Sequence, residues 1–258
     1  MNFIKKYFAK IDANHQFKLG VEELKKGLID NAIELFDRAI EKYEDHLPSH
    51  SIKGEIYLDM QRWDKAIECF RKVENLNDSK DNISLYIGVA ECGVGNTETG
   101  IKYLNKQIEK TPLRPEPYWN KAIANLRVEK FDKALIDIDK ALNILPHNGY
   151  LYSIKAEILD GMNDYENAEK NYDIAISKDE NYINGKIEFQ IRNDKINDAI
   201  KELKILIEKH PFEGGLYFKR GELYEKLNNN ELALNDYKKA FENGITAGKI
   251  KMRELNIA

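Results

Sequence analysis

The chain has 258 residues, 42% of them hydrophobic and 33% charged, so it can bury a sizeable core and is not disordered. Its net charge of −4 gives no global basic field for nucleic acid or anionic lipid, and no apolar run is long enough to span a membrane. The two cysteines fit neither a disulfide framework nor a zinc cluster, and the six prolines favour an all-helical protein.

The N-terminal segment, residues 1–13, carries an apolar stripe at helical spacing. Its members are Phe3, Ile4, Tyr7, Phe8 and Ile11. No continuous apolar segment follows its lysines, so we expect no secretory signal here and a cytoplasmic protein. The stripe is either a cap over the end of the core or a docking helix for a partner or a membrane surface.

Seven copies of a short phrase follow, each with a small residue, a large apolar residue four positions later and usually a small one after that. The phrases begin at Ala32, Ala66, Gly100, Ala134, Ala168, Ala199 and Ala233, in steps of 34 residues apart from one step of 31. Twelve residues before most of these phrases lies another small residue: Gly20, Gly54, Gly88, Ala122, Ala156 and Gly221. The apolar spacing predicts a pair of antiparallel helices, A and then B, in every unit.

These phrases define the expected domain organisation. The seven units are residues 14–46, 47–80, 81–114, 115–148, 149–179, 180–213 and 214–244, and a C-terminal capping helix is expected over 245–258. The third unit has Gly100 where the others have Ala, which predicts the softest unit. The sixth unit lacks three residues, which predicts an irregularity near residues 178–197.

The period of 34 and the series Tyr217, Gly221, Tyr224, Ala233, Tyr237 and Ala240 resemble the tetratricopeptide repeat (TPR) family. The resemblance covers about residues 14 to 244. It implies an all-α fold, a right-handed α-solenoid of antiparallel helix pairs. In that family the A helices line a concave groove that binds peptides or protein segments.

No catalytic constellation is visible in the sequence, so we expect no enzyme, no cofactor and no metal site. His46 and His50 have the spacing of a metal pair, but Pro48 lies between them and should break a helix there, which favours a surface loop. Cys69 and Cys92 are expected to be inert packing residues on helices. No phosphate-binding loop is present, and the carboxylates are expected on solvated helix faces.

The resemblance assigns the candidate partner-binding residues to the A helices. They are Phe17, Val21, Leu85, Val89, Trp119, Asn120, Ile123, Leu126, Glu157, Glu188, Phe218 and Glu222. The third and fourth units present apolar residues, with Trp119 as the expected anchor, whereas units five to seven present acids. Each of these side chains could instead pack laterally between neighbouring A helices.

The expected partner is therefore a protein or peptide with apolar and basic residues, not nucleic acid. The carboxylate clamp of some family members, built from Lys and Asn on successive A helices, is not expected, because only Asn120 matches one of its positions. The leading function is a non-catalytic protein-interaction scaffold. The alternative is a regulatory or assembly subunit that forms a homo-oligomer, or docks, through its ends or convex face.

Overall fold

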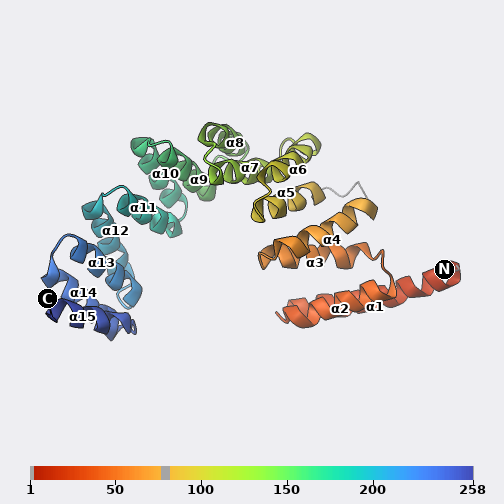
Figure 1. Ribbon diagram of the computed structural model, residues 1–258, viewed down its shortest axis with the longest axis horizontal. Helices are drawn as coiled ribbons and strands as arrows, with labels where there is room; N and C mark the ends of the chain where they lie inside the picture. The colour runs from red at the N-terminus through yellow and green to blue at the C-terminus, as the bar shows by residue number, and fades with distance from the viewer. Residues whose placement is uncertain (1–2, 77–81, 258) are drawn as a thin grey trace. The chain divides into compact units, whose positions relative to one another are not determined.

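The computed structural model of the protein describes residues 3–76 and 82–257. Within these residues every regular element is helical, with 15 α-helices and one short 3-10 helix (Figure 1). The chain divides into two compact units, Met1–Pro146 and His147–Ala258, which we describe separately. The prediction of an all-α protein is confirmed.

The first unit contains four helix pairs. They are α1 (Phe3–Lys25) with α2 (Ile29–Lys42), α3 (Leu47–Asp59) with α4 (Trp63–Leu76), α5 (Ile83–Gly93) with α6 (Thr97–Lys110), and α7 (Glu116–Arg127) with α8 (Phe131–Ile144). The partners of each pair contact one another, and the B helices α2, α4 and α6 each contact the A helix that follows. The A helices α3, α5 and α7 also lie side by side.

The second unit contains three pairs and a terminal helix. The pairs are α9 (Gly149–Gly161) with α10 (Tyr165–Lys178), α11 (Ile183–Arg192) with α12 (Ile196–Lys209), and α13 (Gly214–Lys226) with α14 (Asn230–Glu242). The last helix, α15 (Ala247–Ile257), packs against α14. Its position is that of the expected capping helix.

The small residue of each A helix makes room for a large side chain of its B helix. A Cβ atom added at Gly54 would lie 2.6 Å from Cε1 of Phe70, and one added at Gly221 would lie 2.8 Å from Cε1 of Tyr237. Phe70 and Tyr237 are fully buried. The absence of a side chain on glycine therefore leaves space for the ring 16 residues later. The ring packs directly against the backbone of the A helix.

Gly100 has a similar steric reason. A Cβ at this position would lie 2.2 Å from the sulfur of Cys92 and 2.7 Å from the carbonyl oxygen of Gly88. Helices α5 and α6 thus approach each other too closely for the Ala that other repeats carry. We predicted from Gly100 that this unit is the softest. The structure adds a steric reason for glycine at this position, which is the close contact between the two helices.

Every A helix ends in the same turn. One residue in each turn has a positive φ: Gly27, Gln61, Gly95, Glu129, Asn163, Asp194 and Asn228. The residue after it donates its backbone N–H to a carbonyl five positions back, as Arg62 does to Tyr57 at 2.7 Å. This is the Schellman motif, which satisfies the free carbonyls at a helix end.

The irregularity predicted near residues 178–197 is present. A 3-10 helix, Glu180–Tyr182, precedes α11, which has only 10 residues. The three residues missing from the sixth unit thus shorten its A helix, as expected.

Helix α1 continues through the expected boundary between residues 13 and 14. It has 23 residues against 14 in α2, and its N-terminal end projects beyond the α1–α2 pair (Figure 1). Ile4, Tyr7 and Phe8 are each about 60% exposed (61%, 58% and 60%), and Ile11 is 46% exposed. An apolar stripe this exposed does not cover the end of a core.

Candidate functional site

The predicted groove residues of α1 belong mainly to the protein interior. Phe17 and Val21 are half-buried and pack against a core cluster that includes Phe36. The ring of Phe17 lies 5.6 Å from that of Phe36 and 5.5 Å from that of His46, centroid to centroid. Phe17 and Val21 therefore expose only part of their surface to a ligand.

Leu85 on α5 is a correction to the expected groove. Its side chain is only 6% exposed, so it is not an accessible contact residue. The A helices α3 and α7 both contact α5. The burial of Leu85 agrees with the packing role that we considered as the alternative for each groove position.

The apolar row of the third and fourth repeats remains partly accessible. Val89 on α5 and Trp119, Ile123 and Leu126 on α7 are all half-buried. Asn120 is also half-buried, and its amide donates a 2.8 Å hydrogen bond to the carbonyl oxygen of Glu116 on its own helix. This row is a surface with an aromatic side chain at its centre and no fully exposed apolar residue.

The predicted acids of the second unit are exposed, but several of their neighbours are already paired. Glu188 on α11 forms an ion pair with Lys219 on α13. Asp160, one turn beyond Glu157 on α9, is held by Arg192 of α11 at 2.6 Å. Part of the expected acidic column is thus neutralised by cations from the next A helix.

Among these acids, Glu157 has a carboxyl group whose pKa is shifted. The residue as a whole is exposed, yet protein atoms surround its carboxyl, and this desolvation raises its pKa. The nearby charge of Arg192 opposes the rise in pKa, and that of Asp160 adds to it. An added cation near Glu157 would lower this pKa again.

The remaining candidates lie on α13. Glu222 is exposed, whereas Phe218 is half-buried with its ring 5.4 Å from that of Tyr237. The hydroxyl of Tyr237 donates a 2.6 Å hydrogen bond to Glu225, which is also paired with Lys251 of α15. Phe218 thus belongs partly to the core, and Glu222 alone is a surface residue.

His46 and His50 are not a surface-loop pair. Both are buried, with 2% and 7% of their surface exposed. Pro48 starts α3 instead of breaking a helix, because the first turn needs no proline N–H, and His46 caps that helix by accepting from the Ser49 N–H at 3.3 Å. Within residues 3–76 and 82–257, no group of His, Cys, Asp and Glu could hold a metal ion.

The two cysteines have the environment of packing residues. Both thiols are free, and burial raises the pKa of Cys69 and that of Cys92 to about 11. A thiol with such a pKa carries little thiolate at neutral pH and is a poor nucleophile.

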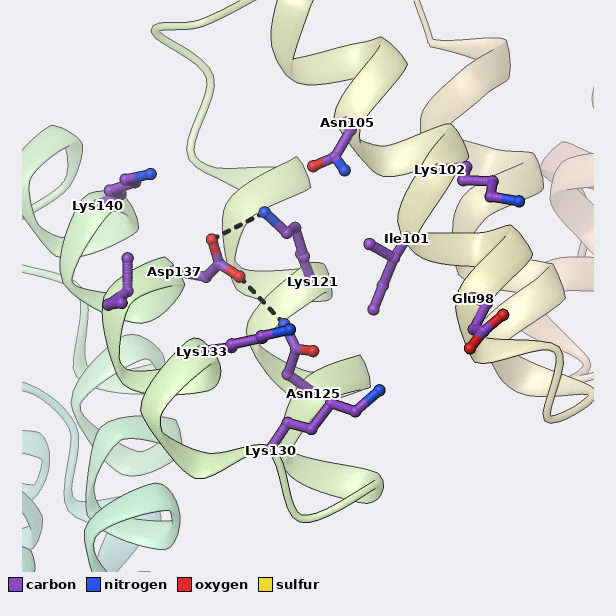
Figure 2. A pocket seen from close by; sticks show the side chains of 11 residues that line it. Glu98, Ile101, Lys102, Asn105, Lys121, Asn125, Lys130, Lys133, Asp137 and Lys140 are labelled. Carbon is purple, nitrogen blue, oxygen red and sulfur yellow. Dashed lines mark hydrogen bonds and ion pairs between the residues drawn. The ribbon is translucent and has the colours of Figure 1, made fainter.

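Sequence reasoning missed a cavity on the other side of α7. It has a volume of about 500 Å³ and lies between α6, α7 and α8 (Figure 2). Five lysines line it: Lys102, Lys121, Lys130, Lys133 and Lys140. We expected carboxylates to lie on solvated helix faces, and Asp137, which lines this cavity, is instead buried.

A recurring ion pair could have signalled this inner charge. Lys121 and Asp137 are 16 residues apart and lie 3.1 Å from each other, with the Asp137 side chain only 4% exposed. The same spacing joins Lys186 to Glu202 at 2.7 Å and Arg220 to Asp236 at 2.8 Å. A cation on the A helix and an acid 16 positions later therefore mark a buried pair between A and B.

Among the described residues, no helix is both long enough and apolar enough to cross a membrane. Two family models described as tetratricopeptide repeat match the chain, over residues 17–81 and 215–243. A TPR repeat-containing protein of Methanocaldococcus jannaschii is 28% identical over 163 residues, which cover 63% of this chain and 26% of that protein. The match therefore spans about a quarter of the relative.

Solved structures share the fold. A tetratricopeptide repeat protein from Parabacteroides merdae has a TM-score of 0.71 at 17% identity, covering 96% of this chain and 99% of that one. PilW, a type IV pilus biogenesis factor, has a TM-score of 0.67 at 18% identity over 77% of this chain and 94% of its own. MamA has a TM-score of 0.58 at 20% identity over 66% and 92%. These similarities support the α-solenoid fold class and no specific partner.

Proposed function

We propose that this chain, a tetratricopeptide repeat protein of about seven repeats, is a non-catalytic scaffold that binds a segment of a partner protein on its A helices. The observation that carries the proposal is the partly accessible apolar row of Val89, Trp119, Ile123 and Leu126. Aromatic side chains in half-enclosed positions contribute most of the binding energy in many protein interfaces. Neither matching family model belongs to an enzyme family.

The partner segment would offer apolar side chains to α5 and α7. The second unit, taken by itself, would favour basic partner residues at Glu157 and Glu222, whereas Glu188 and Asp160 are already paired with Lys219 and Arg192. A basic partner residue would have to compete with those two cations. We therefore expect apolar contacts to dominate the affinity and the acids to add selectivity.

Affinity capture from native cells tests the proposal. The bait would be the wild-type chain, the variant Trp119→Ala, and Phe212→Ser as a matched control at a side chain that is 85% exposed in a loop. We expect a partner that the wild type and Phe212→Ser retain and that Trp119→Ala loses. A partner retained equally by all three baits would place binding elsewhere.

The exposed end of α1 favours a second function, self-association through this helix. Ile4, Tyr7, Phe8 and Ile11 form a stripe with the three- and four-residue steps of a helix-pairing seam. Contiguous exposed apolar surface of this kind usually marks an interaction site. A second copy of the same stripe would cover it.

Light scattering at increasing protein concentration tests self-association. We expect the mass of the wild type to rise with concentration, and the double variant Tyr7→Ser, Phe8→Ser to remain a monomer. Phe212→Ser should behave like the wild type, since it removes an even more exposed aromatic ring outside the stripe. A wild type that stays monomeric at every concentration would exclude this function.

A further inference from the structure

The cavity between α6, α7 and α8 is strongly basic although the whole chain is acidic. Five lysines and the two carboxylates of Glu98 and Asp137 line it, a formal charge of +3 in a chain whose net charge is −4. Its volume of about 500 Å³ lies within the usual range of ligand sites, about 300–1,000 Å³. The cavity is thus a local concentration of positive charge.

Most of this charge is not neutralised within the described residues. Asp137 is occupied by Lys121 at 3.1 Å and by the amide of Asn125, which donates at 3.2 Å (Figure 2). The ammonium groups of Lys102, Lys130 and Lys133 form no ion pair in the described part of the chain. Lys140 lies over the ring of Tyr118, with 6.0 Å from its nitrogen to the ring centroid.

An equivalent cavity two repeats earlier shows what is particular about this one. It lies between α2, α3 and α4. Its lysines Lys53, Lys65 and Lys72 correspond, in this order and at a constant offset of 68 residues, to Lys121, Lys133 and Lys140. There the lysines face the acids Asp37 and Glu68. Asn105 and Ile136 occupy the two corresponding positions here.

These two replacements remove the charges found at Asp37 and Glu68. In the earlier cavity Lys53 is bonded to Asp37, and Lys72 lies 3.5 Å from Glu44, which is outside the lining. In the later cavity Lys121 is paired with Asp137, whereas Lys133 and Lys140 form no ion pair within the described residues. The earlier cavity therefore has two acids for three lysines and the later one has two acids for five, which leaves the later cavity more open to an external anion.

The distribution of the lysines favours an extended ligand. Lys130 immediately precedes α8, and Lys140 lies within it, ten residues later. At the rise of an α-helix, their backbone positions are about 15 Å apart. A ligand that contacts both lysines without drawing their side chains together is longer than a single phosphate group. The lining residues also include no aromatic ring or Arg, the groups that stack nucleic acid bases.

The cavity also has an apolar part. Ile136 on α8 is 57% exposed, and Ile101 on α6 also lines the cavity. Together with the aliphatic stems of the lysines, they form a surface for an apolar side chain between the ammonium groups. Lys121 and Asn125 reach this cavity from the side of α7 opposite Trp119 and Ile123, since they are about 200° further around the helix.

We propose that this cavity is a second binding site, distinct from the A-helix row, for an acidic peptide segment with apolar residues between its carboxylates. Its carboxylates would pair with Lys102, Lys130, Lys133 and Lys140, and an apolar residue would lie between Ile101 and Ile136. The scaffold would then hold two segments of opposite charge preference on opposite sides of α7.

Fluorescence anisotropy with a defined peptide tests this site. The probe is a fluorescein-labelled peptide of repeated Glu-Glu-Leu triplets, and the control probe has Gln in place of Glu. We expect the double variant Lys133→Gln, Lys140→Gln to bind the Glu probe about tenfold more weakly than the wild type, with affinity falling as salt rises. Both lysines are exposed, so these variants should fold, as circular dichroism would verify.

The earlier cavity supplies the matched control. The double variant Lys65→Gln, Lys72→Gln removes the same charge from equivalent positions and should change the affinity little. Ile136→Glu, which introduces the acid found at Glu68, should weaken binding like the double lysine variant. The proposal is overturned if the Glu probe does not bind, if both lysine pairs matter equally, if inorganic phosphate displaces the probe more effectively than sodium chloride at the same ionic strength, or if a thymidine oligonucleotide binds more tightly.

Discussion

Gly54 and Phe70 show at the residue scale how each repeat joins its two helices. The ring fills the space that a side chain at residue 54 would occupy, and it also stacks on Tyr86 of the next A helix at 5.0 Å. The ring therefore links helices α3, α4 and α5. The combination of a small residue with a large one 16 positions later is thus a single structural unit.

Gly54→Ala should destabilise the protein. The new Cβ would lie 2.6 Å from a fully buried ring, and overpacking of a core costs about 1–3 kcal/mol. This cost outweighs the gain of up to about 1 kcal/mol in helix propensity. Urea denaturation followed by circular dichroism would measure the change.

Gly215→Ala is the control for that measurement. Gly215 is also within a helix, but a Cβ there would meet nothing within 4 Å. We expect this variant to gain up to about 1 kcal/mol of stability. If Gly54→Ala gained as much, the ring would have room to move and the proposed contact would be wrong.

His46 predicts a pH dependence of stability. Burial lowers the pKa of this imidazole, with His50 and Lys10 adding repulsion, so the unfolded chain binds a proton at a higher pH than the folded protein does. Its contribution is present above the unfolded pKa of about 6.5 and is lost as the pH falls toward the folded pKa. We expect the free energy of unfolding to decrease below pH 6.5, by at most about 1.4 kcal/mol per pH unit from this group.

His46→Asn tests that assignment, because Asn retains the helix cap without a titratable ring. Thermal unfolding between pH 7.5 and pH 5.5 should show a flatter decline for this variant than for the wild type. His147→Asn removes an exposed imidazole and should leave the decline unchanged. An identical decline in all three proteins would mean that other groups cause it.

At the scale of elements, the A–B turn requires a left-handed residue in every repeat. Two of the seven positions have Gly, three have Asn or Asp, and the other two have Gln61 and Glu129. Non-glycine residues other than Asn and Asp are strained in this conformation by roughly 1–2 kcal/mol. Gln61 and Glu129 therefore store strain at the ends of α3 and α7.

Gln61→Gly should stabilise the protein by about 1 kcal/mol, since glycine adopts the φ of 56° without strain. Asn228→Gly changes the same turn in the last repeat but starts from a residue that tolerates it, so we expect a change of only a few tenths. The midpoint of urea unfolding measures both. Equal effects of the two substitutions would contradict the strain at Gln61.

The positions of the helices could be predicted from the sequence, but the burial and pairing of individual side chains could not. The period of 34 and the apolar spacing depend on local geometry, and they predicted the A and B helices and the short α11. Whether Leu85 is enclosed, or whether Asp160 meets Arg192, depends on how the next A helix is rotated and placed. One repeat considered alone does not contain that information.

The basic cavity illustrates the same limit at the candidate site. Lys65, Lys72, Lys133 and Lys140 follow the repeat and could have been aligned in sequence. Their availability depends in part on Asp37, which comes from the preceding B helix, and on the residue that takes its place. The 68-residue offset aligns Asn105 with Asp37, but only the structure shows that both positions line a cavity with these lysines.

At the scale of the whole molecule, we propose a scaffold with separate surfaces for separate partners. The A-helix row of α5 and α7 offers apolar contacts, the cavity of α6, α7 and α8 offers positive charge, and the end of α1 offers an apolar stripe. A repeat architecture suits this arrangement because each repeat contacts only its neighbours. A surface substitution in one repeat can then change one interaction without unfolding the rest.

The central claim is that a partner segment binds the A-helix row, and titration calorimetry with a captured partner tests it most directly. The partner would be titrated into the wild type, Trp119→Ala, Ile123→Ala, and the control Lys65→Gln, Lys72→Gln. We predict a loss of about 2 kcal/mol or more in binding free energy for Trp119→Ala, a smaller loss for Ile123→Ala, and no change for the control. Unchanged affinity in both α7 variants would contradict the account.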